Sequence, residues 1–295
     1  MLPLNIIQEA KKLTESTSTD LFSQIQFTTI QSSLSEDPIV SSYVVQGDSS
    51  KPAIVLLHGF DSSLMEYRRL LPLLTEKYQV WVVDLLGFGF TQRQKNLKYS
   101  PSAIKTHLHA FWQQMINKPI VLAGASMGGA TAIDFSLTYP DIVTELILLD
   151  SGGLLKQPIV GKFLFPPLGF LATEFLRNLK VRQNISQTAY FDRSFASEDA
   201  LTCAALHLLC DNWNNALISF TKSGGYGSFA KQLTELDLPC LILWGKNDRI
   251  LGVKPAQKFL DYIPHGKLIW IDDCGHVPHL EQSSLTANHI LNFLA

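Results

Sequence analysis

Short apolar runs alternate along this chain with segments in which apolar residues recur every three or four positions. Continuous apolar runs are typical of strands buried on both faces of a parallel sheet, and the periodic segments are typical of helices. The predicted strands are residues 39–46, 53–57, 79–84, 120–123, 143–149, 240–245 and 267–271, with 39–46 half exposed. The predicted helices are residues 65–74, 102–117, 127–139, 255–262 and one that begins near 284.

The alternation of strands and helices predicts an α/β fold with a mostly parallel twisted sheet flanked by helices. It stops after Asp150 and resumes near residue 237, and the residues between hold helical pieces, prolines, aromatics and glycines. We therefore expect an N-terminal arm (1–38), a first core part (39–150), an inserted, mainly helical lid (151–236) and a second core part (237–295). Such an insertion is expected over the carboxyl edge of the sheet, where ligands bind in α/β folds.

Helix-capping residues refine two of these elements. Ser63 and Glu66 have the spacing of a capping box, which predicts that the helix 65–74 begins there. Ser100 or Ser102 is expected to cap the helix 102–117, and Pro140 ends the helix 127–139.

The stretch 120–129 reads Ile-Val-Leu-Ala-Gly-Ala-Ser-Met-Gly-Gly, which places a G-x-S-x-G motif between a predicted strand and a predicted helix. A sharp strand-to-helix turn of this kind needs glycines, and it presents the serine near the positive end of the helix. Ser126 is therefore the candidate nucleophile. The alternative is a structural turn that merely uses glycines.

A serine nucleophile needs a base, and the base needs a carboxylate that fixes its tautomer. His276 and Asp248 each follow a late strand, and the order Ser126, Asp248, His276 is the order found with such elbows. Competing candidates for the base are His279 and His58. Asp248 is alternatively a turn residue, and Asp150, at the end of the strand 143–149, is the alternative carboxylate. We expect Asp84 to brace loops by hydrogen bonds.

An oxyanion hole requires two preorganised N–H groups. The backbone N–H of Met127 directly follows Ser126, and the N–H of Phe60 follows His58 and Gly59 at another strand end. Phe60 and Met127 are therefore the candidate donors. A plain strand-to-helix turn is the alternative for 58–60.

Composition narrows the class of protein. The formal net charge is −2 in 295 residues, so no nucleic-acid surface is expected, and 46% hydrophobic residues suffice for a large core. The four cysteines, at 203, 210, 240 and 274, form no C-x-x-C motif and are expected as free thiols. Neither a signal peptide nor a membrane span is apparent, which predicts a cytoplasmic protein.

Taken together, several motifs resemble the α/β-hydrolase superfamily: His58-Gly-Phe, Asp84-Leu-Leu-Gly-Phe-Gly, Gly124-Ala-Ser-Met-Gly-Gly, Gly245-Lys-Asn-Asp-Arg and Gly275-His-Val-Pro-His-Leu-Glu. The resemblance covers residues 40 to 295 and implies a triad of Ser126, Asp248 and His276, oxyanion donors Phe60 and Met127, and a lid. Within the superfamily, the chain looks similar to cyanobacterial and plastid hydrolases. Members that use an aspartate nucleophile differ from it, because position 126 is serine.

These observations predict a serine hydrolase that cleaves a carboxylic ester. The alternatives are hydrolysis of a C–C bond in a vinylogous diketone, and a non-catalytic ligand receptor. Cofactors and metals are not expected, since no nucleotide-binding motif occurs and His276-x-x-His279 lacks a third ligand.

The predicted lid carries clues to the substrate and to motion. Apolar clusters at 154–155, 163–165, 168–171 and 175–176 either pack the lid onto the core or surround an apolar small-molecule ester, and contact of the lid with a membrane surface is an option. Glycines in 223–228 predict either a hinge or a rigid turn.

Overall fold

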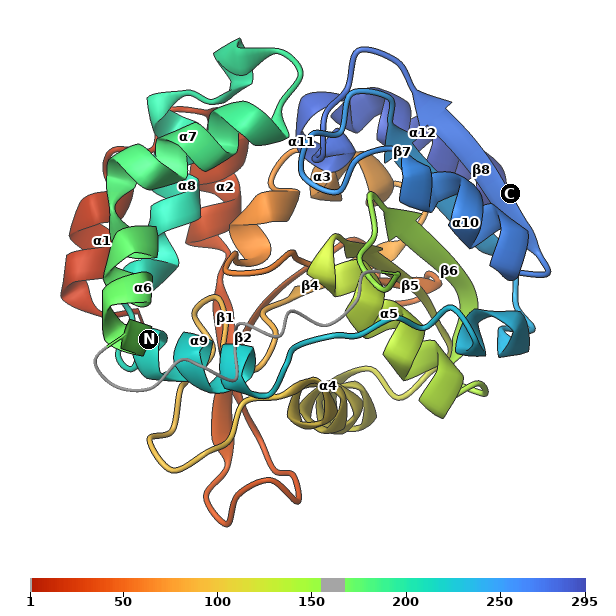
Figure 1. The fold of residues 1–295 in the computed structure, drawn as a ribbon. Helices are drawn as coiled ribbons and strands as arrows, with labels where there is room; N and C mark the ends of the chain where they lie inside the picture. The colour runs from red at the N-terminus through yellow and green to blue at the C-terminus, as the bar shows by residue number, and fades with distance from the viewer. Residues whose placement is uncertain (1, 155–167) are drawn as a thin grey trace.

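The computed structural model describes residues 2–154 and 168–295 and contains an eight-stranded sheet in the order β1-β2-β4-β3-β5-β6-β7-β8 (Figure 1). The strands β3 to β8 run parallel, and β1 and β2 pair antiparallel at one edge. The strands are β1 (Gln26–Ile30), β2 (Ile39–Gln46), β3 (Ala53–Leu57), β4 (Gln79–Val83), β5 (Ile120–Ala125), β6 (Val143–Leu149), β7 (Cys240–Gly245) and β8 (Gly266–Ile271). The predicted, mostly parallel sheet is thereby confirmed.

Helices cover both faces of this sheet, and alternate residues along each strand point to opposite faces. In β3, Val55 and Leu57 join the core on the side of α4 (Pro101–Met115), whereas Ile54 and Leu56 join the core beneath α3 (Leu71–Leu74). The further helices of the α/β core are α5 (Met127–Thr138), α10 (Lys254–Tyr262), α11 (Pro278–Glu281) and α12 (Ser283–Phe293). Both faces are apolar because the central strands are buried throughout.

The predicted helix 65–74 is divided into a 3-10 turn, η1 (Leu64–Tyr67), and α3. Pro72 lies in the first turn of α3; it has no N–H with which to continue a helix from η1. Ser63 caps η1 by accepting from the N–H of Met65, but Glu66 bonds elsewhere, so the predicted capping box does not form. Ser100 caps α4 through the N–H of Ala103, which decides between the two candidate caps.

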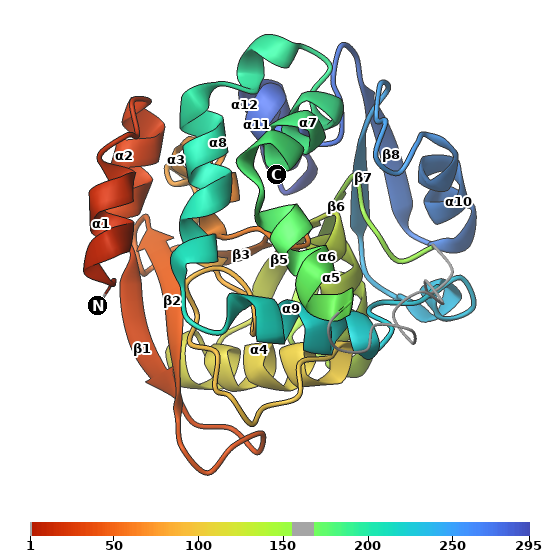
Figure 2. The same cartoon turned by 60° about the vertical axis from the view of Figure 1, so that its left-hand side comes forward.

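The N-terminal residues hold a strand that the sequence pattern did not predict. In β1, three of five residues are partly buried or exposed polar residues, which is typical of an edge strand. The helices α1 (Leu4–Ala10) and α2 (Ser16–Ser23) precede it and pack beside α8 (Glu198–Ala205; Figure 2). Asp199 in α8 anchors the start of α2 by accepting from the N–H of Glu15 at 3.0 Å and from the Ser18 hydroxyl at 2.6 Å.

Residues 151–236 connect β6 to β7 and are called the insertion below. Its described elements are α6 (Leu168–Arg177), α7 (Leu179–Ala189), η3 (Arg193–Phe195), α8 (Glu198–Ala205), η4 (Leu206–Leu209), α9 (Trp213–Lys222) and η5 (Gln232–Glu235). The apolar clusters at 155 and 163–165 lie outside the described residues. Within 2–154 and 168–295, no helix combines the length and the apolar character needed to cross a bilayer.

Candidate active site

Ser126 is the single residue between the end of β5 and the start of α5. Its backbone is strained, with φ of +51° and ψ of −117°, and its N–H donates to the carbonyl of Leu149 at 3.0 Å. Glycine is required on both sides of it. A Cβ at Gly124 would lie 2.2 Å from the carbonyl oxygen of Gly128, and a Cβ at Gly128 would lie 2.0 Å from that of Leu57. This geometry is the sharp strand-to-helix turn that the sequence predicts, and the role of Ser126 as the nucleophile stays a prediction.

His276 and Asp248 meet although 28 residues separate them. The distance from Nδ1 of His276 to Oδ2 of Asp248 is 3.0 Å, and both side chains are buried. The other oxygen of Asp248 accepts from the N–H groups of Ile250 at 2.7 Å and Leu251 at 3.0 Å. Although burial favours the neutral acid, the hydrogen bond and charge of His276 and these N–H groups hold the pKa of Asp248 below its ordinary value.

Ser126 and His276 line a common cavity of about 320 Å³ that lies between the core and the insertion. The core contributes the residues 59–62 and η1, and the insertion contributes α7 and α8. Twelve of the 21 lining residues have mainly apolar side chains: Phe60, Met65, Leu176, Ile185, Ala189, Tyr190, Ala200, Cys203, Ala204, Ile250, Val277 and Leu280. The candidate nucleophile and the candidate base therefore face one partly open, mainly apolar space.

The peptide that links Gly59 to Phe60 is held at Gly59, by His58 on one side and Glu66 on the other. Nδ1 of His58 lies 2.8 Å from the carbonyl oxygen of Gly59, and Nε2 lies 3.1 Å from the N–H of Leu85. His58 must donate at Nδ1 and accept at Nε2, so it is the neutral Nδ1–H tautomer. The N–H of Gly59 in turn donates to Oε2 of Glu66 at 2.8 Å. The direction of the Phe60 N–H is thereby fixed, as an oxyanion donor requires.

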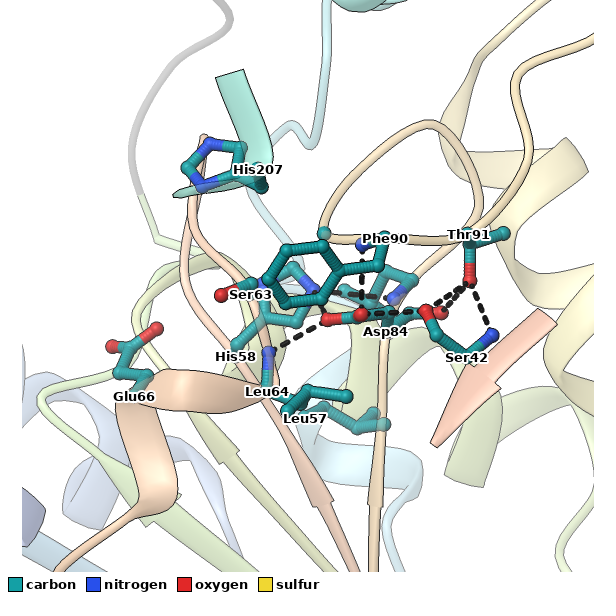
Figure 3. Close-up of polar contacts among 12 residues, drawn as sticks. Ser42, Leu57, His58, Ser63, Leu64, Glu66, Asp84, Phe90, Thr91 and His207 are labelled. Atoms are coloured by element: carbon teal, nitrogen blue, oxygen red, sulfur yellow. Dashed lines mark hydrogen bonds and ion pairs between the residues drawn. The ribbon is translucent and has the colours of Figure 1, made fainter. Parts of the chain in front are cut away.

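Asp84 braces the loops around this peptide, as the sequence predicts (Figure 3). Its carboxyl group accepts from the N–H of Leu64 at 2.6 Å, the N–H of Phe90 at 2.8 Å and the hydroxyl of Ser42 at 2.6 Å. Complete burial raises the pKa of Asp84 despite these contacts. Asp84 is fully buried behind His58, so its role is structural.

Three acidic residues of the site were not predicted from the sequence. Glu66 bonds to Gly59, and Glu281 accepts from the N–H groups of Gly275 at 2.7 Å and Asp192 at 2.7 Å. Asp61, next to Phe60, is the third. Through these two bonds, Glu281 joins the loop before His276 to the insertion. For Glu66, the only signal in the sequence was its capping-box spacing, which indicated a different hydrogen-bond partner.

Asp61 joins the loop that carries the candidate oxyanion donor Phe60 to three parts of the insertion. Its carboxylate forms an ion pair with Arg182 of α7, lies 3.3 Å from Nε2 of His207 in η4, and accepts from Nε1 of Trp213 in α9 at 2.8 Å. Burial opposes its ionisation, but His207, Arg182 and Trp213 together hold the pKa of Asp61 below its ordinary value. The insertion is thus anchored one residue from the candidate oxyanion donor.

The remaining candidates occupy other positions. His279 bonds to Glu66 and His58 to Gly59, so neither ring is paired with Asp248. Asp150 lies behind Asp248: their oxygens and a ring nitrogen of His276 all fall within 4.8 Å of one another. These three groups have metal-ligand spacing, yet Asp248 already bonds to His276 and to two N–H groups. An ion would have to displace those bonds, so this cluster fits a hydrogen-bonded network better than a metal site.

A model of the α/β hydrolase fold matches residues 52–283, and the chain belongs to this family of hydrolases. An α/β hydrolase domain-containing protein of Arabidopsis thaliana, VTE7, is 29% identical over 245 residues, which span 82% of this chain and 74% of that protein. The 2-hydroxy-6-oxo-6-(2'-aminophenyl)hexa-2,4-dienoic acid hydrolase of Metapseudomonas resinovorans is 28% identical over 251 residues (82% and 83%). A thermophilic esterase from Thermogutta terrifontis superposes with a TM-score of 0.77 over 91% of this chain and 98% of its own, at 21% identity.

Proposed function

We propose that the protein is a cofactor-independent serine hydrolase that cleaves a lipophilic carboxylic ester. The observation that carries the proposal is the buried contact of His276 with Asp248, in a cavity that Ser126 also lines. A carboxylate at Nδ1 keeps the proton on that nitrogen, and the lone pair therefore lies on Nε2. This is the tautomer that a general base for a serine hydroxyl requires.

The proposed reaction has two halves. Oγ of Ser126 attacks the ester carbonyl while Nε2 of His276 takes the hydroxyl proton, and the N–H groups of Phe60 and Met127 hold the oxyanion. The C–O bond to the alcohol breaks, and His276 returns the proton to the leaving oxygen. Water then attacks the acyl-enzyme by the same route and releases the carboxylic acid and Ser126.

The cavity supports an apolar substrate, and we propose the insertion as its lid. Ile185, Ala189 and Ala200 of the insertion face the space in front of Ser126, where they would shield an acyl-enzyme from bulk water. Leu171 and Phe175 of α6 are exposed, which supports transient contact of the lid with a lipid surface. The volume of about 320 Å³ suits one medium-sized acyl or alcohol group.

C–C bond hydrolysis is the second candidate, and two arginines at the cavity favour it. Arg68 and Arg182 both line the cavity, and within the described residues neither Nη2 of Arg68 nor Nε of Arg182 has a hydrogen-bond partner. A guanidinium group with free N–H donors suits a carboxylate. The Metapseudomonas resinovorans relative acts, by its name, on a dienoic acid.

The test compares multiple turnover of p-nitrophenyl butyrate and octanoate with that of a 2-hydroxy-6-oxo-dienoate, whose loss is followed by its visible absorbance. We expect many turnovers of the esters and slow turnover of the dienoate. The reverse ranking would select the C–C hydrolase. A single turnover with either substrate would instead support a receptor that retains a reactive serine.

A further inference from the structure

A second buried carboxyl group lies directly behind the predicted triad acid. Asp150 follows the last residue of β6, has φ of +39° and is fully buried. Its Oδ1 and Oδ2 lie 3.1 and 3.3 Å from the N–H of Gly245, the last residue of β7. One N–H cannot satisfy the several acceptor sites of a buried carboxylate, so its ionised form would be poorly stabilised.

The surroundings of Asp150 are negative. Asp248 lies within 4.8 Å of it, and the charge of Glu281 also acts on it. Two buried carboxylates at such a distance do not both ionise readily, because each negative charge raises the free energy of the other. Burial, followed by the charge of Asp248, raises the pKa of Asp150 well above its ordinary value, whereas the contacts of Asp248 lower the pKa of that residue.

We propose that Asp150 is a positioning residue whose neutral carboxyl group donates a hydrogen bond to Asp248 and holds that carboxylate against Nδ1 of His276. In the neutral form, one oxygen of Asp150 carries the proton for Asp248 and the other accepts the N–H of Gly245. Every polar atom of the group then has a partner. The role rests on the proposed function, because it presupposes that His276 acts as the base.

This role differs from that of a triad acid. The direct partner of His276 is Asp248, at 3.0 Å. A charged Asp150 would repel Asp248 and loosen that contact, whereas a neutral donor completes a chain from the end of β6 through Asp248 to His276. Gly245 links the chain to the end of β7. The position of the base is thus set by two neighbouring strand ends as well as by its own loop.

The experiment compares three variants at this network. Asp150→Asn keeps a neutral donor of the same shape, and asparagine tolerates a positive φ. Asp150→Gly removes the donor without backbone strain, which alanine at φ +39° would introduce. Asp248→Asn removes the charged partner of His276. Asp261→Asn, at an exposed site on α10, is the matched control for the substitution chemistry.

Asp150→Asn should lower kcat for p-nitrophenyl butyrate by at most about threefold, and Asp150→Gly by roughly ten- to a hundredfold with KM little changed, the loss expected for one hydrogen bond to a charged group. Asp248→Asn should lower kcat on the order of a thousandfold or more. In a boronate adduct, the strongly deshielded Nδ1 proton of His276 should keep its NMR position in Asp150→Asn and move in Asp150→Gly. A merely structural role would leave that proton in place.

The proposal is overturned if Asp150→Asn is as damaging as Asp248→Asn at an unchanged melting temperature, since Asp150 would then act as a charge. It is also overturned if folded Asp150→Gly matches the wild type. Should Asp150→Gly fail to fold, the comparison of Asp150→Asn with Asp248→Asn decides alone. The rate of fluorophosphonate labelling of Ser126 is measured in parallel, because it reports triad geometry even if the wild type hydrolyses no ester.

Discussion

Oε1 of Glu66 lies 3.1 Å from Nε2 of His279, although 213 residues separate the two in the chain. The other carboxylate oxygen of Glu66 accepts from the N–H of Gly59 at 2.8 Å. Burial opposes ionisation, yet the hydrogen bond and charge of His279 lower the pKa of Glu66 to about 2. The Glu66–His279 pair therefore joins the loop of the candidate oxyanion donor to the helix that follows His276.

This contact predicts a graded effect of substitutions at Glu66. Glu66→Ala leaves the N–H of Gly59 without an acceptor and frees the peptide that carries the N–H of Phe60, so kcat for p-nitrophenyl butyrate should fall by about ten- to a hundredfold. Glu66→Gln keeps an acceptor for the N–H of Gly59, so its kcat should fall less. Binding of a phenylboronic acid, which forms a tetrahedral adduct, should weaken in the same order. Equal activity of the two variants would show that Gly59 does not depend on this acceptor.

His276 and His279, three residues apart, form a matched pair for testing the base. His276→Ala should lower kcat by several orders of magnitude, because only this ring is paired with Asp248. His279→Ala should be much milder, since it removes a partner of Glu66 and leaves the N–H of Gly59 bonded. Steady-state kinetics at matched melting temperatures give the ranking. The reverse order would move the base to His279.

His107 predicts a loss of stability in mild acid. Its ring is buried in α4 beside the hydroxyl of Ser41, and burial lowers the pKa of His107 from 6.5 to about 4. Between these values the unfolded chain binds a proton that the folded protein excludes. The free energy of unfolding should therefore fall as the pH drops from 6.5 to 4, by about 3 kcal/mol from this residue at 1.36 kcal/mol per pKa unit.

Urea unfolding of wild type and His107→Gln at pH 7 and pH 4.5 measures this contribution. Glutamine can still bond to Ser41 but does not titrate, so the variant should lose less stability between the two pH values. Parallel losses in both proteins would assign the acid sensitivity to other groups, among them His207, whose pKa burial also lowers to about 4.

Gly224 and Gly225 bear on the hinge prediction, because both have positive φ, of 90° and 59°. If 223–228 is a hinge of the lid, Gly225→Ala should stiffen it and lower kcat/KM for p-nitrophenyl decanoate more than for the acetate. The control is the ratio of the two rates in the wild type. A uniform drop, or none, would favour a rigid turn.

Most of the core fold could be predicted from the sequence, because buried parallel strands appear in it as continuous runs of apolar residues. Continuous apolar runs predicted β3 to β8, whereas β1 was missed because it is an edge strand with polar residues on both faces. The division of residues 65–74 depends on Pro72 and on a distant partner of Glu66. Periodicity over a single segment contains neither the backbone break nor the tertiary contact.

The candidate site was predictable where chain order determines position. Asp248 and His276 follow adjacent strands, β7 and β8, and the structure brings them together, while their catalytic roles stay predictions. The long-range partners of Asp61 and Glu66 lie between 121 and 213 residues away, on the insertion or beyond it. Such pairings follow from how distant segments pack in the folded chain, which no local pattern encodes.

The most direct test of the account is the fate of Ser126 during turnover. Wild type should hydrolyse p-nitrophenyl butyrate over many cycles and take up one fluorophosphonate group, which peptide mass spectrometry locates on Ser126. Ser126→Ala should take up no label. Its kcat should be about a thousandth of the wild-type value or lower, at an unchanged melting temperature. Ser136→Ala, a buried serine of the following helix α5, should retain both. Turnover by Ser126→Ala within tenfold of the wild type, or a label on another residue, would contradict the assignment of the nucleophile.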